Sequence, residues 1–172
     1  MKILEGYERF IENVNNGLKR VGISAHELAM MDHICYRVAT GERYKQILAD
    51  LGGATLLGEA IISGRPIATI ELEEPLEAGG WRVPYLELPS PKQSSPYPEG
   101  LEHVEFVVIG GLDRFAARHS DLDFDRGGMG KDLNPELGLK DGDLSVKFHE
   151  QPLGAVVRIE HRLGRTLPQP QR

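Results

Sequence analysis

The feature that most constrains the fold is an internal repeat, in which two strand-like segments each begin with an acid and a histidine. DHICYRV starts at Asp32 and EHVEFVV starts at Glu102, and apolar positions alternate with other residues after the histidine of each. A helix-like segment follows each of them, starting at positions 42 and 112, again 70 residues apart. Two copies of one unit at a fixed offset predict a duplicated fold.

Two glutamates also take matching places in the two copies. YLELP holds Glu87 and RIEHR holds Glu160, 73 residues further on, which is close to the 70 that separate His33 and His103. Each copy then has the order strand, helix and three strands. We therefore expect an α+β fold in which paired βαβββ modules form a curved mixed sheet, or partly open barrel, with an N-terminal helical extension.

The expected organisation is a single domain with four segments. Residues 1–28 form the helical extension, 29–92 the first module, 93–164 the second module and 165–172 a disordered tail. The second module closes with two strands, at 144–150 and 155–161, and the two modules are joined by a proline-rich linker at 89–100. Ser24 caps a short second helix through HELAMM.

Strand geometry indicates where the four matching residues point. Successive side chains face opposite sides of a sheet, so His33 shares a face with Cys35, and His103 with Glu105. Glu87 and Glu160 separate in the same way from their apolar neighbours. If the copies lie side by side, the four groups converge in one cup.

Composition limits the chemistry that this cup can carry. The chain has 172 residues, a net charge of −6 and a single cysteine, Cys35, which excludes an internal disulfide and a multi-cysteine metal site. An acidic chain argues against nucleic acid as a partner, and no apolar run approaches the roughly 18–20 residues that cross a bilayer. We expect a cytoplasmic protein without membrane partners, as a monomer or homodimer. Two imidazoles and two carboxylates suit Zn, Ni, Mn or Fe(II).

The ordered set of motifs resembles the vicinal oxygen chelate superfamily, which includes glyoxalase I, extradiol dioxygenases and methylmalonyl-CoA epimerase. DHICYR, YLELPSPK and LEHVEFVV after a helical N-terminal segment are most similar to its YecM-like branch, to which no defined reaction is attached. In the superfamily, each module supplies a His or similar ligand from its first strand and a Glu from its last. The resemblance implies metal ligation by His33, Glu87, His103 and Glu160, and a metal-dependent lyase, isomerase or oxygenase.

Other residues on the same faces suggest how a substrate is held. Arg37, Lys147 and Arg158 place positive charge near the expected metal, so we expect a small oxygen-rich anion such as a carboxylate or enediolate. The alternative is that these cations only neutralise neighbouring glutamates. Glu87 or Glu160 can act as a general base, and His149 is either an acid/base group or a polar residue at a strand end.

Several other interpretations stay open or are weaker. RGGMGK at 126–131 lacks the glycine and the Ser or Thr of a phosphate loop, and Asp121, Asp123 and Asp125 have a misplaced glycine for a calcium loop. Cys35 is more simply a small residue within a pleat than a nucleophile. The alternative function is a non-catalytic protein that binds or sequesters a small ligand on the same fold. A protein-interaction module would predict neither metal nor small-ligand binding.

Overall fold

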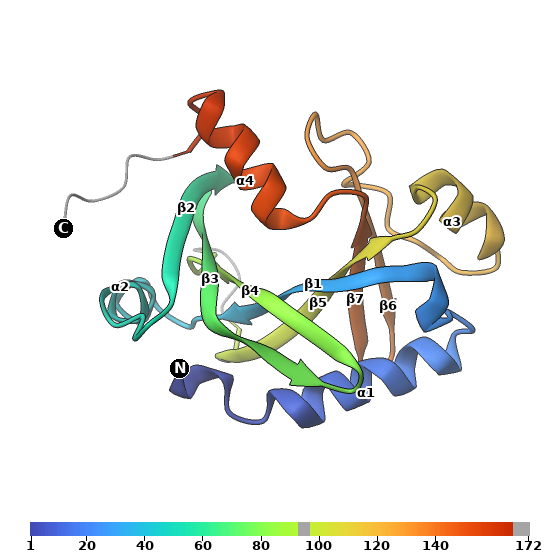
Figure 1. The fold of residues 1–172 in the computed structure, drawn as a ribbon, viewed down its shortest axis with the longest axis horizontal. Coiled ribbons are helices and arrows are strands. Elements are labelled where there is room, and N and C mark those ends of the chain that lie inside the picture. The colour runs from blue at the N-terminus through green and yellow to red at the C-terminus, as the bar shows by residue number, and fades with distance from the viewer. Residues whose placement is uncertain (93–96, 167–172) are drawn as a thin grey trace.

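The computed structural model describes residues 1–92 and 97–166, which form one seven-stranded curved sheet with helices around it (Figure 1). The strand order is β2-β3-β4-β1-β5-β7-β6. The α-helices are α1 (Tyr7–Arg20), α2 (Gly41–Ala49), α3 (Leu112–Arg118) and α4 (Leu153–Arg162). The strands are β1 (Leu28–Arg37), β2 (Thr55–Ile62), β3 (Arg65–Ala78), β4 (Trp81–Pro89), β5 (Gly100–Val108), β6 (Glu136–Asp141) and β7 (Leu144–His149). The predicted α+β class is confirmed.

The two modules meet at the centre of the sheet, where β1 and β5 pair antiparallel. His33 lies opposite Glu105 and Cys35 lies opposite His103, so the first strands of the modules are related by the predicted offset of 70 residues. Each first strand also has a parallel partner from its own module, β4 beside β1 and β7 beside β5. This arrangement puts both histidine-bearing strands in the middle of one sheet.

The predicted strand at 155–161 is wrong, because these residues belong to α4. In the second module β7 takes the place that β4 has in the first, and α4 follows where a further strand was expected. The helix begins after Pro152, and the buried Val156 and Val157 lie one turn beyond Leu153. Its first free backbone N–H, on Leu153, donates to the buried Asp32 carboxylate at 2.8 Å.

The N-terminal region is helical as predicted, with one correction. Ser24 and Glu27 form a capping box, but the turn that they cap is a short 3-10 helix, Ala25–Glu27, and β1 already begins at Leu28. A further 3-10 turn, Lys2–Leu4, precedes α1. Helix α1 packs beneath the sheet, where its Asn15 accepts a hydrogen bond from the Trp81 indole at 2.8 Å.

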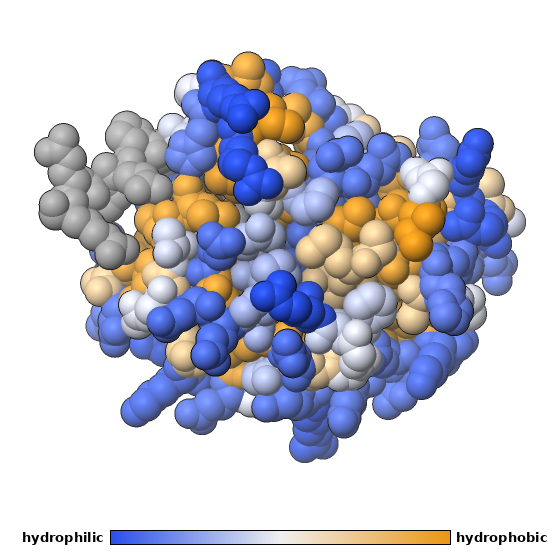
Figure 2. All heavy atoms as spheres, viewed as in Figure 1, coloured by the Kyte–Doolittle hydropathy of each residue, from blue (hydrophilic) through white to orange (hydrophobic). Residues whose placement is uncertain are grey.

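The apolar core lies on the face of the sheet that is opposite the two histidines. Ile34, Leu86, Phe106 and Phe148 are all inaccessible to solvent, as the alternation along their strands predicts. Figure 2 shows that the outer surface is mainly hydrophilic, with apolar atoms gathered in patches, one of them over the end of β2 beneath α4.

Two predictions fall wholly or partly outside the described residues. Positions 93–96 of the predicted proline-rich linker and 167–172 of the predicted tail are not described. No helix in the described part of the chain is both long and apolar enough to span a membrane.

Candidate metal centre

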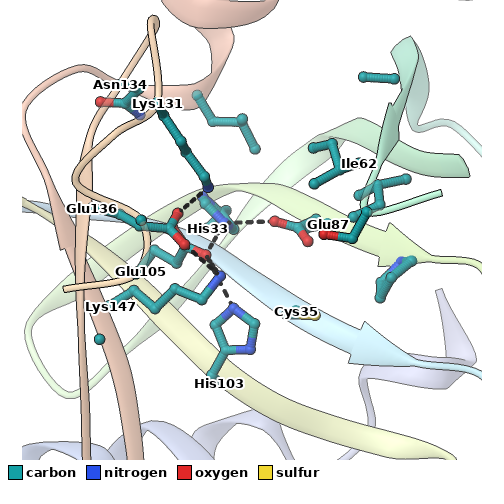
Figure 3. Close-up of a pocket in the computed structure, with 18 of the residues that line it drawn as sticks. His33, Cys35, Ile62, Glu87, His103, Glu105, Lys131, Asn134, Glu136 and Lys147 are labelled. Carbon is teal, nitrogen blue, oxygen red and sulfur yellow. Dashed lines mark hydrogen bonds and ion pairs between the residues drawn. The ribbon is translucent and has the colours of Figure 1, made fainter. Parts of the chain in front are cut away.

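A cavity of about 1070 Å³ opens on the histidine-bearing face of the sheet (Figure 3). Its floor comes from the central strands and its walls come from the β2–β3 hairpin, the segment before β6 and helix α4. Three of the four predicted ligands, His33, Glu87 and His103, lie together on the floor. The alternation argument therefore placed these side chains on the correct face.

The His33 ring is oriented by the acid that precedes it. Its Nδ1 lies 3.0 Å from Asp32 Oδ2, and both side chains are buried. Since the carboxylate can only accept, Nδ1 carries the proton and donates. Nε2 then points to the cavity, 3.2 Å from Glu87 Oε2 and 3.4 Å from Glu105 Oε1. Neither contact has hydrogen-bond geometry, so this buried nitrogen has no hydrogen-bond partner among the described residues.

The His103 ring repeats this arrangement in the second module. Its Nδ1 lies 2.6 Å from Glu102 Oε2, and its Nε2 lies 3.0 Å from Glu105 Oε1. Burial raises the pKa of Glu102, but the contacts with His103 and Arg37 outweigh it and hold the pKa at about 2. Glu102 is therefore ionised and able to fix the ring. The paired acid and histidine that mark the repeat in the sequence thus have one structural role in both modules.

Glu105 is the group on which the cluster converges. Burial raises its pKa, but the charges of His33 and Lys147 and the contact with His103 lower it well below its ordinary value. Burial likewise lowers the pKa of His33, and the Glu105 and Asp32 carboxylates more than reverse this effect, leaving it well above its ordinary value. The cavity floor thus holds ionised carboxylates beside two oriented imidazoles.

This donor set fits a divalent metal ion. His33 offers a nitrogen, and Glu87 and Glu105 one oxygen each, and these three atoms all lie within 4.8 Å of one another. His33 Nε2 is the observation in favour, because it is buried without a hydrogen bond while it faces carboxylate oxygens of Glu87 and Glu105, and buried polar atoms rarely lack a hydrogen bond. The carboxylate that holds Nδ1 is the outer support that metal-binding histidines usually have.

Lys147 stands where the repeat places the second glutamate. Glu87 is in register with Cys35, the position two residues after His33, and Lys147 is in register with Glu105, two residues after His103. Its ammonium contacts Glu105 Oε1 at 2.9 Å and Glu136 Oε1 at 3.5 Å. Burial lowers the pKa of Lys147, but the glutamates raise it above its ordinary value, so the cation is permanent. The second module contributes a fixed positive charge in place of a carboxylate.

The structure does not place Glu160 in this cluster. It lies on α4 and lines the cavity wall, and it is in none of the metal-competent groups formed by the described residues. The register that matched it to Glu87 is wrong because the segment is helical. Burial raises the pKa of Glu160.

The predicted substrate-binding cations lie in different places. Arg37 lines the cavity, pairs with Glu102 and stacks over the Tyr97 ring. Arg158 is exposed on α4 and does not line the cavity. The pairing of Arg37 and of Lys147 with glutamates matches the alternative interpretation, in which these cations neutralise neighbouring acids.

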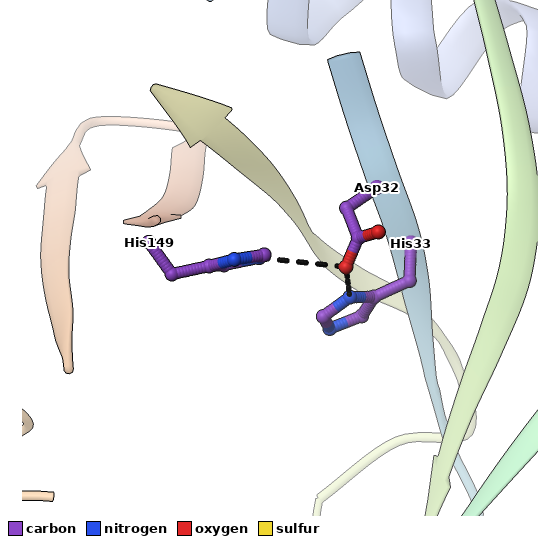
Figure 4. Close-up of side chains that lie close together, drawn as sticks. All are labelled: Asp32, His33 and His149. Carbon is purple, nitrogen blue, oxygen red and sulfur yellow. Dashed lines mark hydrogen bonds and ion pairs between the residues drawn. The ribbon is translucent and has the colours of Figure 1, made fainter. Parts of the chain in front are cut away.

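His149 lies beside the cavity floor, where its ring stacks on that of His33 with centroids 5.9 Å apart (Figure 4). Its Nδ1 donates to the Gln151 carbonyl at 2.7 Å, and its Nε2 lies 3.5 Å from Asp32 Oδ2. Burial lowers the pKa of His149, so the ring is neutral. It does not line the cavity, and in this place it packs against the Asp32–His33 pair.

Sequence reasoning missed Glu105, Asp32 and Glu102 as parts of the site. Glu105 is on the correct face by alternation, two residues beyond His103, but the repeat matched Glu160 and not Glu105 to Glu87. The two acids were already part of the repeat. Their role needed the ring orientations, which a sequence does not carry.

Comparison with known proteins gives a family and a fold. The family model described as YecM protein matches residues 1–126. Protein YecM of Escherichia coli K12 is 32% identical over 170 aligned positions, and the match covers 88% of this chain and 89% of that protein. An uncharacterised protein of Haemophilus influenzae is 32% identical over 103 residues, a match that spans 59% of this chain and about half of that protein.

Solved structures agree with this result. A structural-genomics structure superposes with a TM-score of 0.74 at 27% identity, covering 92% of this chain and 91% of that one. A Streptomyces coelicolor methylmalonyl-CoA epimerase in complex with 2-nitronate-propionyl-CoA superposes with a TM-score of 0.52 at 18% identity, covering 72% and 98%. The chain therefore shares its fold with methylmalonyl-CoA epimerase, one of the proteins to whose superfamily the motifs are similar.

Proposed function

The chain belongs to the YecM family, and from this premise we propose that it binds a divalent metal ion and acts on a small oxygen-rich anion. The proposed ligands are His33, Glu87, His103 and Glu105, and the reaction is of the isomerase, lyase or oxygenase class. Zn, Ni, Mn and Fe(II) all suit two imidazoles with two carboxylates.

One observation carries the proposal, namely that two imidazoles are oriented in the same way towards one shared, buried carboxylate, that of Glu105. In both rings Nδ1 is held by the preceding acid, and Nε2 is turned towards Glu105, which His103 reaches with a hydrogen bond and His33 only with a longer contact. A purely structural pair of histidines would need neither the matched acids nor a buried nitrogen that faces two carboxylates without a hydrogen bond.

The chain's own groups are suited to proton transfer on a bound acid. A bound ion would polarise a substrate carbonyl or carboxylate oxygen. Lys147 offers N–H donors to an anionic oxygen beside Glu105, and it does so without changing its own charge. Glu87 reaches the cavity with a partly exposed carboxylate, so it can accept a proton from a substrate carbon. Glu160, on the α4 wall, faces the bound molecule and not the ion.

Metal analysis of the purified protein, loaded in turn with each ion and dialysed, tests the metal site. We expect one equivalent in the wild type, and a loss of at least tenfold in affinity in His33→Ala and Glu87→Gln. His26→Ala is the matched control, because His26 is exposed on the 3-10 turn before β1. Glu160→Gln keeps its metal. Wild-type protein without metal, or His33→Ala with full metal, would refute the site.

Solvent deuterium exchange into 2-oxo and 2-hydroxy acids, followed by NMR, tests catalysis. We expect exchange that needs the metal and is lost in Glu87→Gln. A second candidate function is metal-assisted binding without turnover. Lys147 supports it, since a fixed cation at the position equivalent to Glu87 leaves the second module without the matching carboxylate. Metal-dependent ligand binding with no exchange in any acid would select this second function.

A further inference from the structure

The cavity continues from the metal-ligand cluster along β3 to a second, chemically different end. Thr69, Ile67 and Arg65 alternate along the strand, and all three line the cavity. Thr69 lies opposite Glu87, and Ile67 lies opposite Pro89. Arg65 is four residues from Thr69. At the rise of a strand, about 3.3 Å per residue, Arg65 therefore lies about 13 Å from the cluster end of the cavity. The cavity is therefore long in one direction.

Arg65 ends this path with unused hydrogen-bond donors. Its Nη1 donates to the Ser90 carbonyl at 2.7 Å and to the Tyr97 hydroxyl at 3.0 Å. Its Nε is buried and has no partner among the described residues, and none of them accepts from Nη2. Within the described residues its guanidinium pairs with no carboxylate, unlike that of Arg37, which is paired with Glu102. Nε and Nη2 form the edge of the guanidinium that binds a carboxylate or phosphate through two parallel hydrogen bonds.

The stretch between the two ends is apolar. Ile67 and Pro89 lie opposite each other on adjacent strands between the two ends. Ile62 lies at the Arg65 end of this stretch, opposite Arg65 on β2. Ile62 is 41% exposed although it is a large hydrophobic residue, and Figure 3 shows it on the Glu87 side of the cavity. Polar groups at both ends and apolar side chains between them match an elongated molecule with the same pattern.

We infer that the ligand is an elongated acid with an oxygen-rich head at the His33 cluster, an apolar middle along β2 and β3, and a second anionic group on Arg65. The second group is a carboxylate or a phosphate, since both match the free edge of the guanidinium. This inference rests on the proposed function for the head group. It adds a second binding site and a length, neither of which the metal cluster defines.

The test compares three series of 2-oxo acids of increasing chain length on metal-loaded protein by titration calorimetry. One series ends in a methyl group, one in a carboxylate and one in a phosphonate. We expect an anionic end to bind about tenfold more tightly than a methyl end, with an optimum where the chain spans about 13 Å. The carboxylate and phosphonate series identify which anion Arg65 prefers, and a gain in either supports the inference.

Arg65→Met should remove the gain and leave the methyl-ended series unchanged, and Arg65→Lys should keep part of it. Arg82→Met is the matched control, because Arg82 is exposed on β4 and does not line the cavity. Urea unfolding of each variant measures how far the loss of the hydrogen bonds to Ser90 and Tyr97 lowers the free energy of unfolding.

The outcomes separate the two proposals. Protein that holds metal but binds all three series equally overturns this inference alone, as does an Arg65→Met variant that keeps the gain. Protein that holds no metal and binds none of the series overturns the proposed function and this inference together.

Discussion

At the scale of single residues, the site depends on an acid, Asp32, that does not line the cavity. Asp32 is fully buried, and one of its oxygens accepts from both His33 Nδ1 and the Leu153 backbone N–H. The same carboxylate therefore fixes the orientation of a proposed ligand and satisfies the first turn of α4. Its other oxygen has no hydrogen-bond partner among the described residues, so the position of the Asp32 carboxylate depends on these two hydrogen bonds.

Asp32→Asn should weaken both functions of the side chain. We expect metal affinity to fall by about 10–100-fold, the usual effect of removing a carboxylate behind a metal-binding histidine. The free energy of unfolding should fall by about 1–3 kcal/mol, because two hydrogen bonds to a charged oxygen become neutral and the new amide NH2 is buried where no acceptor among the described residues is in reach. Calorimetric metal titration and urea unfolding measure the two effects. Asp50→Asn, at the exposed end of α2, is the control, and an equal loss there would contradict a specific role for Asp32.

The sequence was sufficient for His33, His103 and Glu87, because repeat offset and strand alternation are both local patterns. It was insufficient for Glu105 as a ligand and for Lys147 as the residue at the position equivalent to Glu87. Glu105 on β5 and Lys147 on β7 are brought side by side by the parallel pairing of these strands, which depends on contacts between segments about 40 residues apart. The offset of 73 for Glu160 looked similar, and nothing local in the sequence distinguishes the two choices.

At the scale of elements, α4 shows where local pattern fails. AVVRIEH is rich in β-branched residues, which favours a strand. Tertiary contacts override this preference: Asp32 accepts from the first turn, and His161 Nε2 donates to the Leu57 carbonyl at 2.6 Å near the last turn. The helix thereby spans from the end of β7 to β2 and forms one wall of the cavity.

Helix α1 provides a test of element packing at Gly17. A Cβ added there would lie 3.0 Å from Leu144 Cβ and 2.8 Å from its Cδ1, so the helix approaches β7 as closely as only glycine allows. Alanine improves helix propensity by about 1 kcal/mol, but overpacking a buried contact costs about 1–3 kcal/mol. We expect Gly17→Ala to lower the free energy of unfolding by about 1 kcal/mol in urea titrations.

A double-mutant cycle supplies the control for this prediction. In a Leu144→Ala background the clash is absent, so Gly17→Ala should become neutral or stabilising. If Gly17→Ala stabilises the wild-type chain as well, the close approach of α1 to β7 is refuted.

At the scale of the whole molecule, the two modules are joined by side chains as well as by the β1–β5 pairing. Glu99, just before β5, accepts from Tyr36 of β1 at 3.0 Å and from Arg43 of α2 at 2.9 Å. These contacts connect the start of the second module to two elements of the first. Partial burial raises the pKa of Glu99, but the hydrogen bonds from Arg43 and Tyr36 outweigh it and leave the pKa below its ordinary value.

Because its pKa is lowered on folding, Glu99 contributes stability above its unfolded-state pKa of about 4.5, and this contribution is lost as the pH falls through the folded-state value. We expect Glu99→Gln to lower the free energy of unfolding by about 0.5–1 kcal/mol at pH 7, as for a partly exposed ion pair. The difference from wild type should shrink steadily below about pH 4. Urea unfolding of both proteins across this range measures it, with Glu12→Gln on the exposed face of α1 as the control. A difference that stays constant with pH would show that Glu99 joins the modules by packing and not by its charge.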